Sequence, residues 1–170
     1  MVNQSKSIVK NSYYLQSGSI FVAEKATHIS TVVGSCVAVC IYDKERKTGG
    51  MNHFQLPFTK EKDRATARYG NVATFALIYM LINDGSQVQH LEAQIFGGAH
   101  NPEMAHSDIG RENIKVARKA LSKKRIRVVS EDVGGEKGRK IVFKTHTNEI
   151  AVMRVGQLRK GDWHPYESDR

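Results

Sequence analysis

The sequence lacks the long apolar run that a membrane-spanning helix requires. No stretch approaches the roughly 18 consecutive apolar residues typical of such a helix. The N-terminal stretch MVNQSKSIVKNSYYLQSGS also lacks the apolar core of a secretory signal. These two absences predict a cytoplasmic protein that does not insert into a membrane.

Cysteine is scarce, and its spacing argues against a cross-link. Cys36 and Cys40 lie in a predicted strand, where positions four apart are separated by about 13 Å, at about 3.3 Å per residue. A disulfide joins Cα atoms that are within about 7 Å of each other. Two cysteines without a C-x-x-C pair are also too few for a structural zinc site. We therefore expect free thiols in a reducing compartment, with no metal and no cofactor.

Repeats, low-complexity stretches and linkers are absent as well. The 170 residues are enough for one domain with its own core, and 40% apolar with 25% charged residues is ordinary for a soluble globular protein. We expect one domain over residues 1–155, followed by a loosely ordered basic tail over residues 156–170.

The order of periodic segments predicts an α+β fold. Apolar alternation indicates strands, and two longer segments have helical character. The sheets are expected to be mixed or antiparallel, with the helices covering them. The predicted strands cover residues 12–16, 19–24, 28–33, 37–42, 51–56, 92–98, 125–133, 139–147 and 149–155, and the predicted helices cover residues 68–83 and 108–124.

The two helices differ in pattern. The segment RYGNVATFALIYMLIN is apolar almost all round, which is typical of a helix packed inside a fold. The second helix places Ile114, Ala117 and Leu121 on one side and basic residues on the other, as an amphipathic surface helix does.

The formal net charge is +9, and seven basic residues gather in KVARKALSKKRIR, residues 115–127. Such a face suits an acidic partner, although a solvated basic surface has the same composition. The sequence contains no recognisable nucleic-acid module and no aromatic stacking pattern beside the charge. We therefore expect no nucleic-acid partner.

The chemistry of the chain concentrates around Cys36. Gly34 and Ser35 precede it, and glycine there lets a substrate approach the backbone closely. The N–H groups of Ser35 and Cys36 can face a carbonyl oxygen as an oxyanion hole. A hairpin between residues 37–42 and 50–55 would return His53, a candidate base, to the neighbourhood of residues 36–38.

Each of these residues also has a purely structural interpretation. Cysteine is among the most buried residue types, so Cys36 can equally be a core residue, and Cys40 is expected to be one. Phe96, Gly97 and Gly98 either pass near an active site or form a simple turn after a strand. His100 and His106 fit no standard metal-ligand spacing and are expected to be loop histidines.

Five segments together carry a resemblance to a known family. GSCVAVCIYDKERKTGGMNHFQLP, RYGNVATFALIYML, EAQIFGGAHNPEM, IGRENIKVARKAL and VGGEKGRKIVFKTHTNEIAV occur in order between residues 27 and 155. They closely resemble the signature segments of the chemoreceptor glutamine deamidases, the CheD family. That resemblance implies an α/β/β/α sandwich shared with other cysteine deamidases. The departures are Asn52, where the family commonly has a small residue, and His100, where it often has Asn.

The resemblance implies roles for individual residues. Cys36 matches the family's nucleophile and His53 its general base. A hydroxyl residue just upstream completes the family's site, and here Thr31 and Ser30 are both available, with Thr31 favoured.

The resemblance also implies a reaction and partners. The family converts selected glutamines in the cytoplasmic part of methyl-accepting chemoreceptors to glutamate and releases ammonia. A CheC-type phosphatase of the response regulator is the expected second partner, and it occupies the same surface. The alternative functions are a non-catalytic binding module that regulates such a phosphatase, a thiol redox sensor, and an esterase or protease acting on receptor methyl esters.

Overall fold

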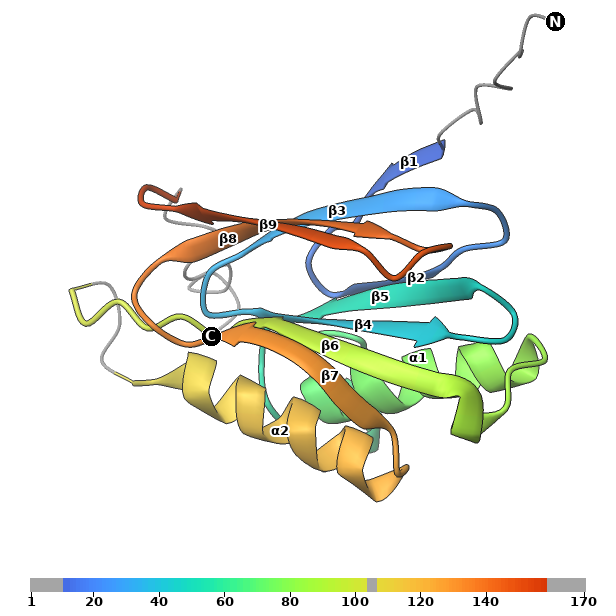
Figure 1. Cartoon of the computed structure of the whole chain (residues 1–170). Helices are drawn as coiled ribbons and strands as arrows, with labels where there is room; N and C mark the ends of the chain where they lie inside the picture. The colour runs from blue at the N-terminus through green and yellow to red at the C-terminus, as the bar shows by residue number, and fades with distance from the viewer. Residues whose placement is uncertain (1–10, 104–106, 159–170) are drawn as a thin grey trace, which may run out of the picture.

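Two β-sheets stack face to face, and two helices cover the outer face of one of them (Figure 1). The structure is a computed structural model that describes residues 11–103 and 107–158. His106 and most of the predicted basic tail lie outside the described residues. The strands are β1 (Asn11–Tyr14), β2 (Ser19–Val22), β3 (Thr27–Val33), β4 (Val37–Asp43), β5 (Thr48–Phe54), β6 (Leu91–Gly97), β7 (Arg127–Val133), β8 (Gly138–Lys144) and β9 (Ile150–Val155), and the helices are α1 (Gly70–Asn83) and α2 (Ile109–Lys123).

The strands divide into a four-stranded sheet with the order β1-β3-β8-β9 and a five-stranded sheet with the order β2-β5-β4-β6-β7. Each sheet contains one parallel pair, β1 with β3 and β6 with β7, among antiparallel neighbours. The predicted hairpin is present as β4 and β5, which pair antiparallel. The mixed sheets and the α+β class therefore confirm the prediction from sequence.

Strand β4 lies at the centre of the five-stranded sheet and is buried on both faces. Val37, Val39 and Ile41 belong to the core between sheet and helices, whereas Ala38 and Cys40 belong to the core between the two sheets. A strand covered on both sides is apolar at nearly every position, which explains why residues 37–42 are all apolar or aromatic. Asp43, the last residue of β4, is a buried polar exception.

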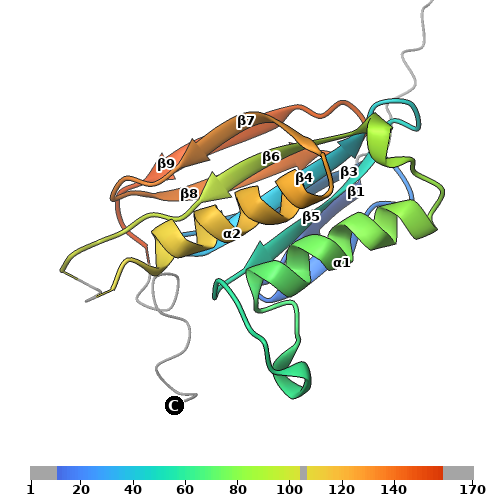
Figure 2. The same ribbon diagram turned by 90° about the horizontal axis from the view of Figure 1, so that it is seen from below.

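Both helices pack on the outer face of the five-stranded sheet (Figure 2). In α2, the three residues expected to face the core, Ile114, Ala117 and Leu121, are buried as predicted. For α1 the expectation of a helix inside the fold is wrong. It has a buried side against the sheet and an exposed side that includes Tyr79 and Met80. Because the exposed side of α1 also contains apolar residues, its sequence does not show an amphipathic pattern.

In the described part of the chain, the layers follow one another in the order helices, five-stranded sheet, four-stranded sheet. Within 11–103 and 107–158, no helix covers the outer face of the four-stranded sheet (Figures 1 and 2). The resemblance implied a helical layer on each side. The difference arises because both long helices connect strands of the same sheet, α1 between β5 and β6 and α2 between β6 and β7, so both remain on that sheet.

Three connections carry the chain from one sheet to the other at the same end of the sandwich. They are residues 15–18 between β1 and β2, residues 34–36 between β3 and β4, and residues 134–137 between β7 and β8. The strand registers bring them together, because Val33 pairs with Arg139 and Val37 pairs with both Phe54 and Gly97. We call this end the crossover end, and Cys36 lies in it.

No helix among the described residues is long and apolar enough to span a membrane.

Candidate active site

Cys36 is the last residue of the 34–36 connection, directly before β4. Its side chain is buried, with 3% exposure, in the core between the sheets. The chain must leave one sheet and enter the other within three residues here. This geometry gives Cys36 a sharply bent backbone on one side and a fixed strand on the other.

Three successive carbonyl groups of this connection accept hydrogen bonds. Ala99 N–H donates to Gly34 at 2.9 Å, and Gly98 N–H donates to Cys36 at 2.8 Å. Between them, the side chain of Asn113 donates through Nδ2 to the Ser35 carbonyl at 3.0 Å. The backbone around Cys36 is therefore held on consecutive residues by the loop after β6 and by α2.

Gly97 and Gly98 are required for this close approach. Gly97 has φ of +109°, and a Cβ atom there would lie 2.2 Å from the Cys36 carbonyl oxygen. Gly98 has φ of +68°, and its Cβ would collide with Ile114. Only glycine adopts these positive angles readily and leaves this space. Both glycines thus pass against the connection that carries Cys36, while Phe96 beside them is buried in the core between the sheets.

His53 approaches Cys36 from the neighbouring strand β5. Its Cα is the partner of Ala38, so Cys36 and His53 are diagonal neighbours in the β4–β5 hairpin. Side chains at diagonal positions on one face of a sheet come within reach of each other when they are long. The Gly18 N–H donates to the His53 carbonyl at 2.7 Å, which anchors the histidine backbone to the connection between β1 and β2.

A buried polar chain runs from His53 to the opposite sheet. The Thr31 Oγ1 lies 2.7 Å from His53 Nδ1, and it donates to the Leu15 carbonyl at 2.8 Å. Thr31 is 1% exposed and His53 is 4% exposed. Hydrogen bonds between such groups have large effects because the alternative is an unsatisfied polar atom in the interior.

The direction of this chain fixes the tautomer of the histidine. A threonine hydroxyl has one proton, and it is used in the bond to Leu15. The contact with His53 must then be made by an Nδ1–H donor to the Thr31 oxygen. In the neutral ring this leaves the lone pair on Nε2, so the basic nitrogen is the one on the far side of the ring from Thr31.

Alternation along β3 decides between the two upstream hydroxyls. Thr31 points into the space between the sheets together with Ile29 and Val33, and all three are buried. Ser30 is half-buried and points the other way, toward the outer face of the four-stranded sheet. The structure therefore brings Thr31, and not Ser30, against His53.

Cys40 lies on the same face as Cys36, four residues further along the chain. Its side chain is fully buried, and burial raises the pKa of its thiol well above the usual value. A thiol that keeps its proton is neither a nucleophile nor a metal ligand. Both cysteines are free thiols.

A second layer of contacts supports the loop around Gly97. Gly134 N–H donates to the Gly97 carbonyl at 2.9 Å, and His100 N–H donates to the Gly135 carbonyl at 2.8 Å. Arg139 in turn binds the turn that contains these glycines. The contacts thus lead from the β7–β8 turn inward to the residues that hold Cys36.

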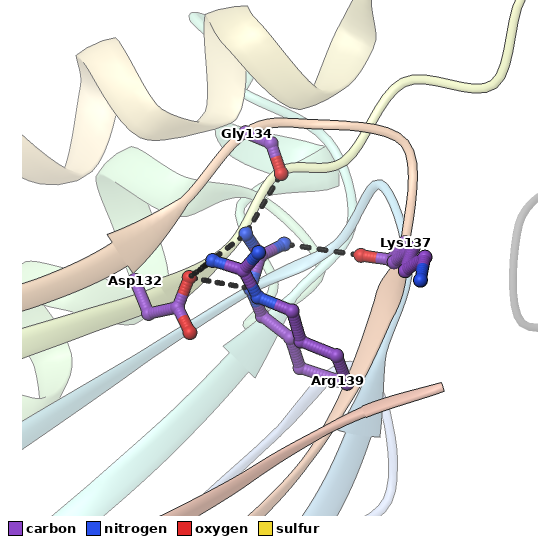
Figure 3. A network of polar contacts seen from close by, with 5 residues as sticks. Asp132, Gly134, Lys137 and Arg139 are labelled. Atoms are coloured by element: carbon purple, nitrogen blue, oxygen red, sulfur yellow. Dashed lines mark hydrogen bonds and ion pairs between the residues drawn. The ribbon is translucent and has the colours of Figure 1, made fainter. Parts of the chain in front are cut away.

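Arg139 begins a strand beside Lys140, a position typical of a surface charge, but the structure buries it. It is 2% exposed. Its guanidinium donates to the Asp132 carboxylate at 3.0 Å and to the carbonyls of Gly134 and Lys137 (Figure 3). A buried arginine is tolerated when its donors are satisfied in this way.

The two departures from the family pattern, Asn52 and His100, lie in different parts of the molecule. The Asn52 side chain accepts from Val39 N–H at 2.9 Å and faces Thr74 of α1, in the layer between sheet and helices. His100 lies 3.9 Å from Asp108 near the start of α2. In the described part of the chain, no three His, Cys, Asp or Glu side chains gather as metal ligands do.

Sequence reasoning missed two groups at this site. One is the Leu15 carbonyl, which no pattern could indicate because it is a backbone atom. The other is Asn113, for which a signal existed, since it falls on the buried side of α2 next to Ile114. A polar residue among core positions of an amphipathic helix indicates a specific hydrogen-bonding partner.

Fold and site together define a two-sheet α+β protein with a buried cysteine, histidine and threonine gathered at one end. Comparison with known proteins identifies the family to which the chain belongs. Residues 55–154 match the family model for CheD, described as chemotactic sensory transduction. With the relatives below, this match shows that the chain belongs to the CheD family.

Relatives named "probable chemoreceptor glutamine deamidase CheD", or CheD 1 for the third one below, match most of the chain. The protein from Trichlorobacter lovleyi is 40% identical over 147 residues, covering 85% of this chain and 91% of the relative. The one from Sulfurimonas denitrificans is 38% identical, covering 84% and 93%. A protein from Anaeromyxobacter dehalogenans is 42% identical over 132 residues, covering 76% and 77%. A match to 85% of this chain necessarily includes Cys36 and His53.

Proposed function

We propose that this protein is a cytoplasmic deamidase that converts selected chemoreceptor glutamines to glutamate through a cysteine nucleophile. The observation that carries the proposal is the buried chain from Leu15 through Thr31 to His53, beside Cys36. A histidine held in one tautomer by a third group is the arrangement by which proteins activate a nucleophilic thiol. The names of the relatives supply the substrate class.

His53 is the general base in this proposal. Because Nδ1 carries its proton toward Thr31, Nε2 is the nitrogen that accepts the proton of the Cys36 thiol. Thr31 stabilises the imidazolium that forms, since its oxygen continues to accept from Nδ1–H. The Leu15 carbonyl keeps the hydroxyl from turning its own proton toward the ring.

The reaction is an acyl transfer in two halves. The Cys36 thiolate attacks the carboxamide carbon of glutamine, and the oxyanion that forms is held by backbone N–H groups of Ser35 and Cys36. The C–N bond then breaks, and protonated His53 gives its proton to the departing ammonia. Water, deprotonated by His53, attacks the thioester, and the C–S bond breaks to release glutamate and the free thiol.

The surface around Cys36 suits the proposed oxyanion hole. The C=O and N–H of one peptide unit point in opposite directions. Asn113 holds the Ser35 carbonyl toward α2, so the Cys36 N–H points away from that helix. Gly34 adds no side chain between this N–H and an approaching carboxamide.

The partners follow from the family and from charge. The net charge of +9 suits a negatively charged helical receptor surface, because complementary charge steers association. Residues 1–155 form the deamidase domain in this proposal, and residues 156–170 form a basic tail. A CheC-type phosphatase is the proposed regulatory partner at the same surface.

The test uses a chemoreceptor cytoplasmic fragment incubated with the protein, with peptide mass spectrometry and measurement of ammonia. We expect specific glutamines to gain about one dalton, because NH₂ is replaced by OH in the hydrolysis. Cys36→Ala abolishes the gain, whereas Cys40→Ala, the matched control, keeps it in the fraction that remains folded. A folded wild-type protein that binds the fragment without changing its mass would instead support the regulatory binding module.

A further inference from the structure

Asn113 is a completely buried polar side chain in the second turn of α2. Its Nδ2 atom lies 3.0 Å from the Ser35 carbonyl oxygen and 3.0 Å from the Gln55 carbonyl oxygen. One of these acceptors directly precedes Cys36, and the other lies two residues after His53. A single amide group thus bridges the backbones that carry the proposed nucleophile and the proposed base.

The chemistry of the two acceptors fixes the orientation of this amide. Both are carbonyl oxygens, and only the NH₂ end of an asparagine has two N–H donors to offer them. An aspartate of the same shape would place an oxygen against two oxygens. A serine has one hydroxyl proton and could satisfy one carbonyl at most.

The β4–β5 strand pairing does not extend to the two bridged segments. Residues 34–36 connect two different sheets, and Gln55 lies just beyond the end of β5. The regular β4–β5 ladder begins only at the pair Val37 and Phe54. Beyond that pair, the chains diverge toward β3 and toward the loop before α1. Asn113 acts at the first position where the ladder no longer holds them.

We propose that Asn113 is a positioning residue, which sets the separation of Cys36 from His53 and the direction of the Cys36 N–H. The proposal rests on the proposed function of the same pair. Asn113 reaches the site from α2, whereas Thr31 and His53 belong to the two sheets and Cys36 to a connection between them. The helix is thereby part of the reactive geometry and not only a cover for the core.

The test measures the reactivity of Cys36 directly, without a receptor. Wild-type protein and the variants Asn113→Asp and Asn113→Ser are alkylated with iodoacetamide across pH 5 to about 10, a range that brackets an ordinary thiol, and modification at Cys36 is read by peptide mass spectrometry. The matched control is Asn71→Asp. Asn71 also lies in a helix and bonds to loop backbone, at Thr59.

We expect the wild-type and Asn71→Asp proteins to share one pH profile, with thiolate-like reactivity below the ordinary thiol pKa of about 8.5. Asn113→Ser, which keeps one donor, shifts the profile toward that value and lowers the alkylation rate at neutral pH about tenfold. Asn113→Asp shifts it further. On the receptor fragment, kcat falls by about tenfold to a hundredfold with little change in KM, as for a misplacement near 1 Å.

The outcomes separate this inference from the proposed function. If Cys36 of the wild-type protein titrates as an ordinary thiol and the receptor fragment is unchanged, the proposed function fails. If the wild-type protein is activated and deamidates the fragment while folded Asn113→Ser has the same profile and kcat, the positioning role is refuted. If Asn113→Asp does not fold, the comparison with the wild-type protein is made with Asn113→Ser alone.

Discussion

The replacement of Thr31 by valine removes one hydroxyl from the centre of the site and keeps the shape of the side chain. Thr31 Oγ1 contacts His53 Nδ1 at 2.7 Å and donates to the Leu15 carbonyl at 2.8 Å, with every group buried. Valine leaves both partners unsatisfied. At about 1–3 kcal/mol for each of the two buried polar groups left without a partner, the cost is about 2–6 kcal/mol.

The same number gives a thermal shift. For a domain of this size, 1 kcal/mol corresponds to about 2–4 °C in the unfolding midpoint, so Thr31→Val lowers the midpoint by roughly 4–24 °C. Thr31→Ser keeps both hydrogen bonds and loses one methyl group, which costs on the order of 1 kcal/mol. The difference between the two variants therefore isolates the hydroxyl.

We expect Thr31→Val and Thr31→Ser to differ in catalytic activity as well. Without Thr31 the histidine is free to adopt either tautomer, and we expect kcat to fall by about 10²- to 10⁴-fold, the range of general acid–base catalysis. Thr31→Ser retains activity within about tenfold on the same grounds. The assay is differential scanning calorimetry together with deamidation rates from pH 5 to about 9, around the histidine pKa. A folded Thr31→Val protein with wild-type rates and pH profile would refute the reasoning.

Further predictions concern the surroundings of the site. Gly97→Ala destabilises the protein by more than about 2 kcal/mol in urea unfolding, because strain at positive φ adds to the collision with the Cys36 carbonyl. Gly134→Ala, at φ of +76° with open space around it, costs only about 1 kcal/mol, and equal losses would contradict the account. Burial alone would raise the pKa of Asp132, but hydrogen bonds from two arginines outweigh it and lower that pKa. A lowered pKa stabilises the fold above the ordinary value near 3.9, so the stability gap between wild type and Asp132→Asn should shrink as pH falls below about 4; a gap independent of pH would exclude this role. Iodoacetamide at neutral pH should modify Cys36 and spare Cys40, whose pKa is raised by burial, and the opposite selectivity would remove Cys36 as the nucleophile.

Local pattern was sufficient to predict the elements and the hairpin that brings His53 to Cys36. Strands β3 to β9 and helix α2 follow from alternation and helical spacing, which depend only on near neighbours in sequence. Alternation does not set the β4–β5 register, because both strands are buried on both faces. The short connection between them, residues 44–47, sets it instead, as loop length does in hairpins.

The pairing of strands across the crossover end did not follow from pattern. The Ser17–Gly18 turn looks like a hairpin break, yet β1 and β2 belong to different sheets. Nothing in either strand indicates its partner, since the choice depends on how both sheets fill the space between them. For the same reason the sequence left Thr31 and Ser30 both open, because the parity of β3 relative to the site is set by the opposing sheet.

Burial of charge was the other feature that pattern could not predict. Arg139 begins a strand next to Lys140 in a basic stretch, and both look like surface residues. Its burial depends on Asp132 and on the turn carbonyls, which meet it only after β7 and β8 join different sheets. Asn113, in contrast, could have been predicted from the sequence, since it is a polar residue on the apolar face of α2.

The most direct test of the account is deamidation of a chemoreceptor fragment in water enriched in ¹⁸O. A thioester formed at Cys36 and hydrolysed by solvent places one solvent oxygen in each new carboxyl group, so each modified glutamine gains about three daltons in place of about one. We predict this gain with the wild-type protein and none with Cys36→Ser. Equal conversion by folded Cys36→Ser, or conversion without the heavier isotope, would contradict hydrolysis through Cys36.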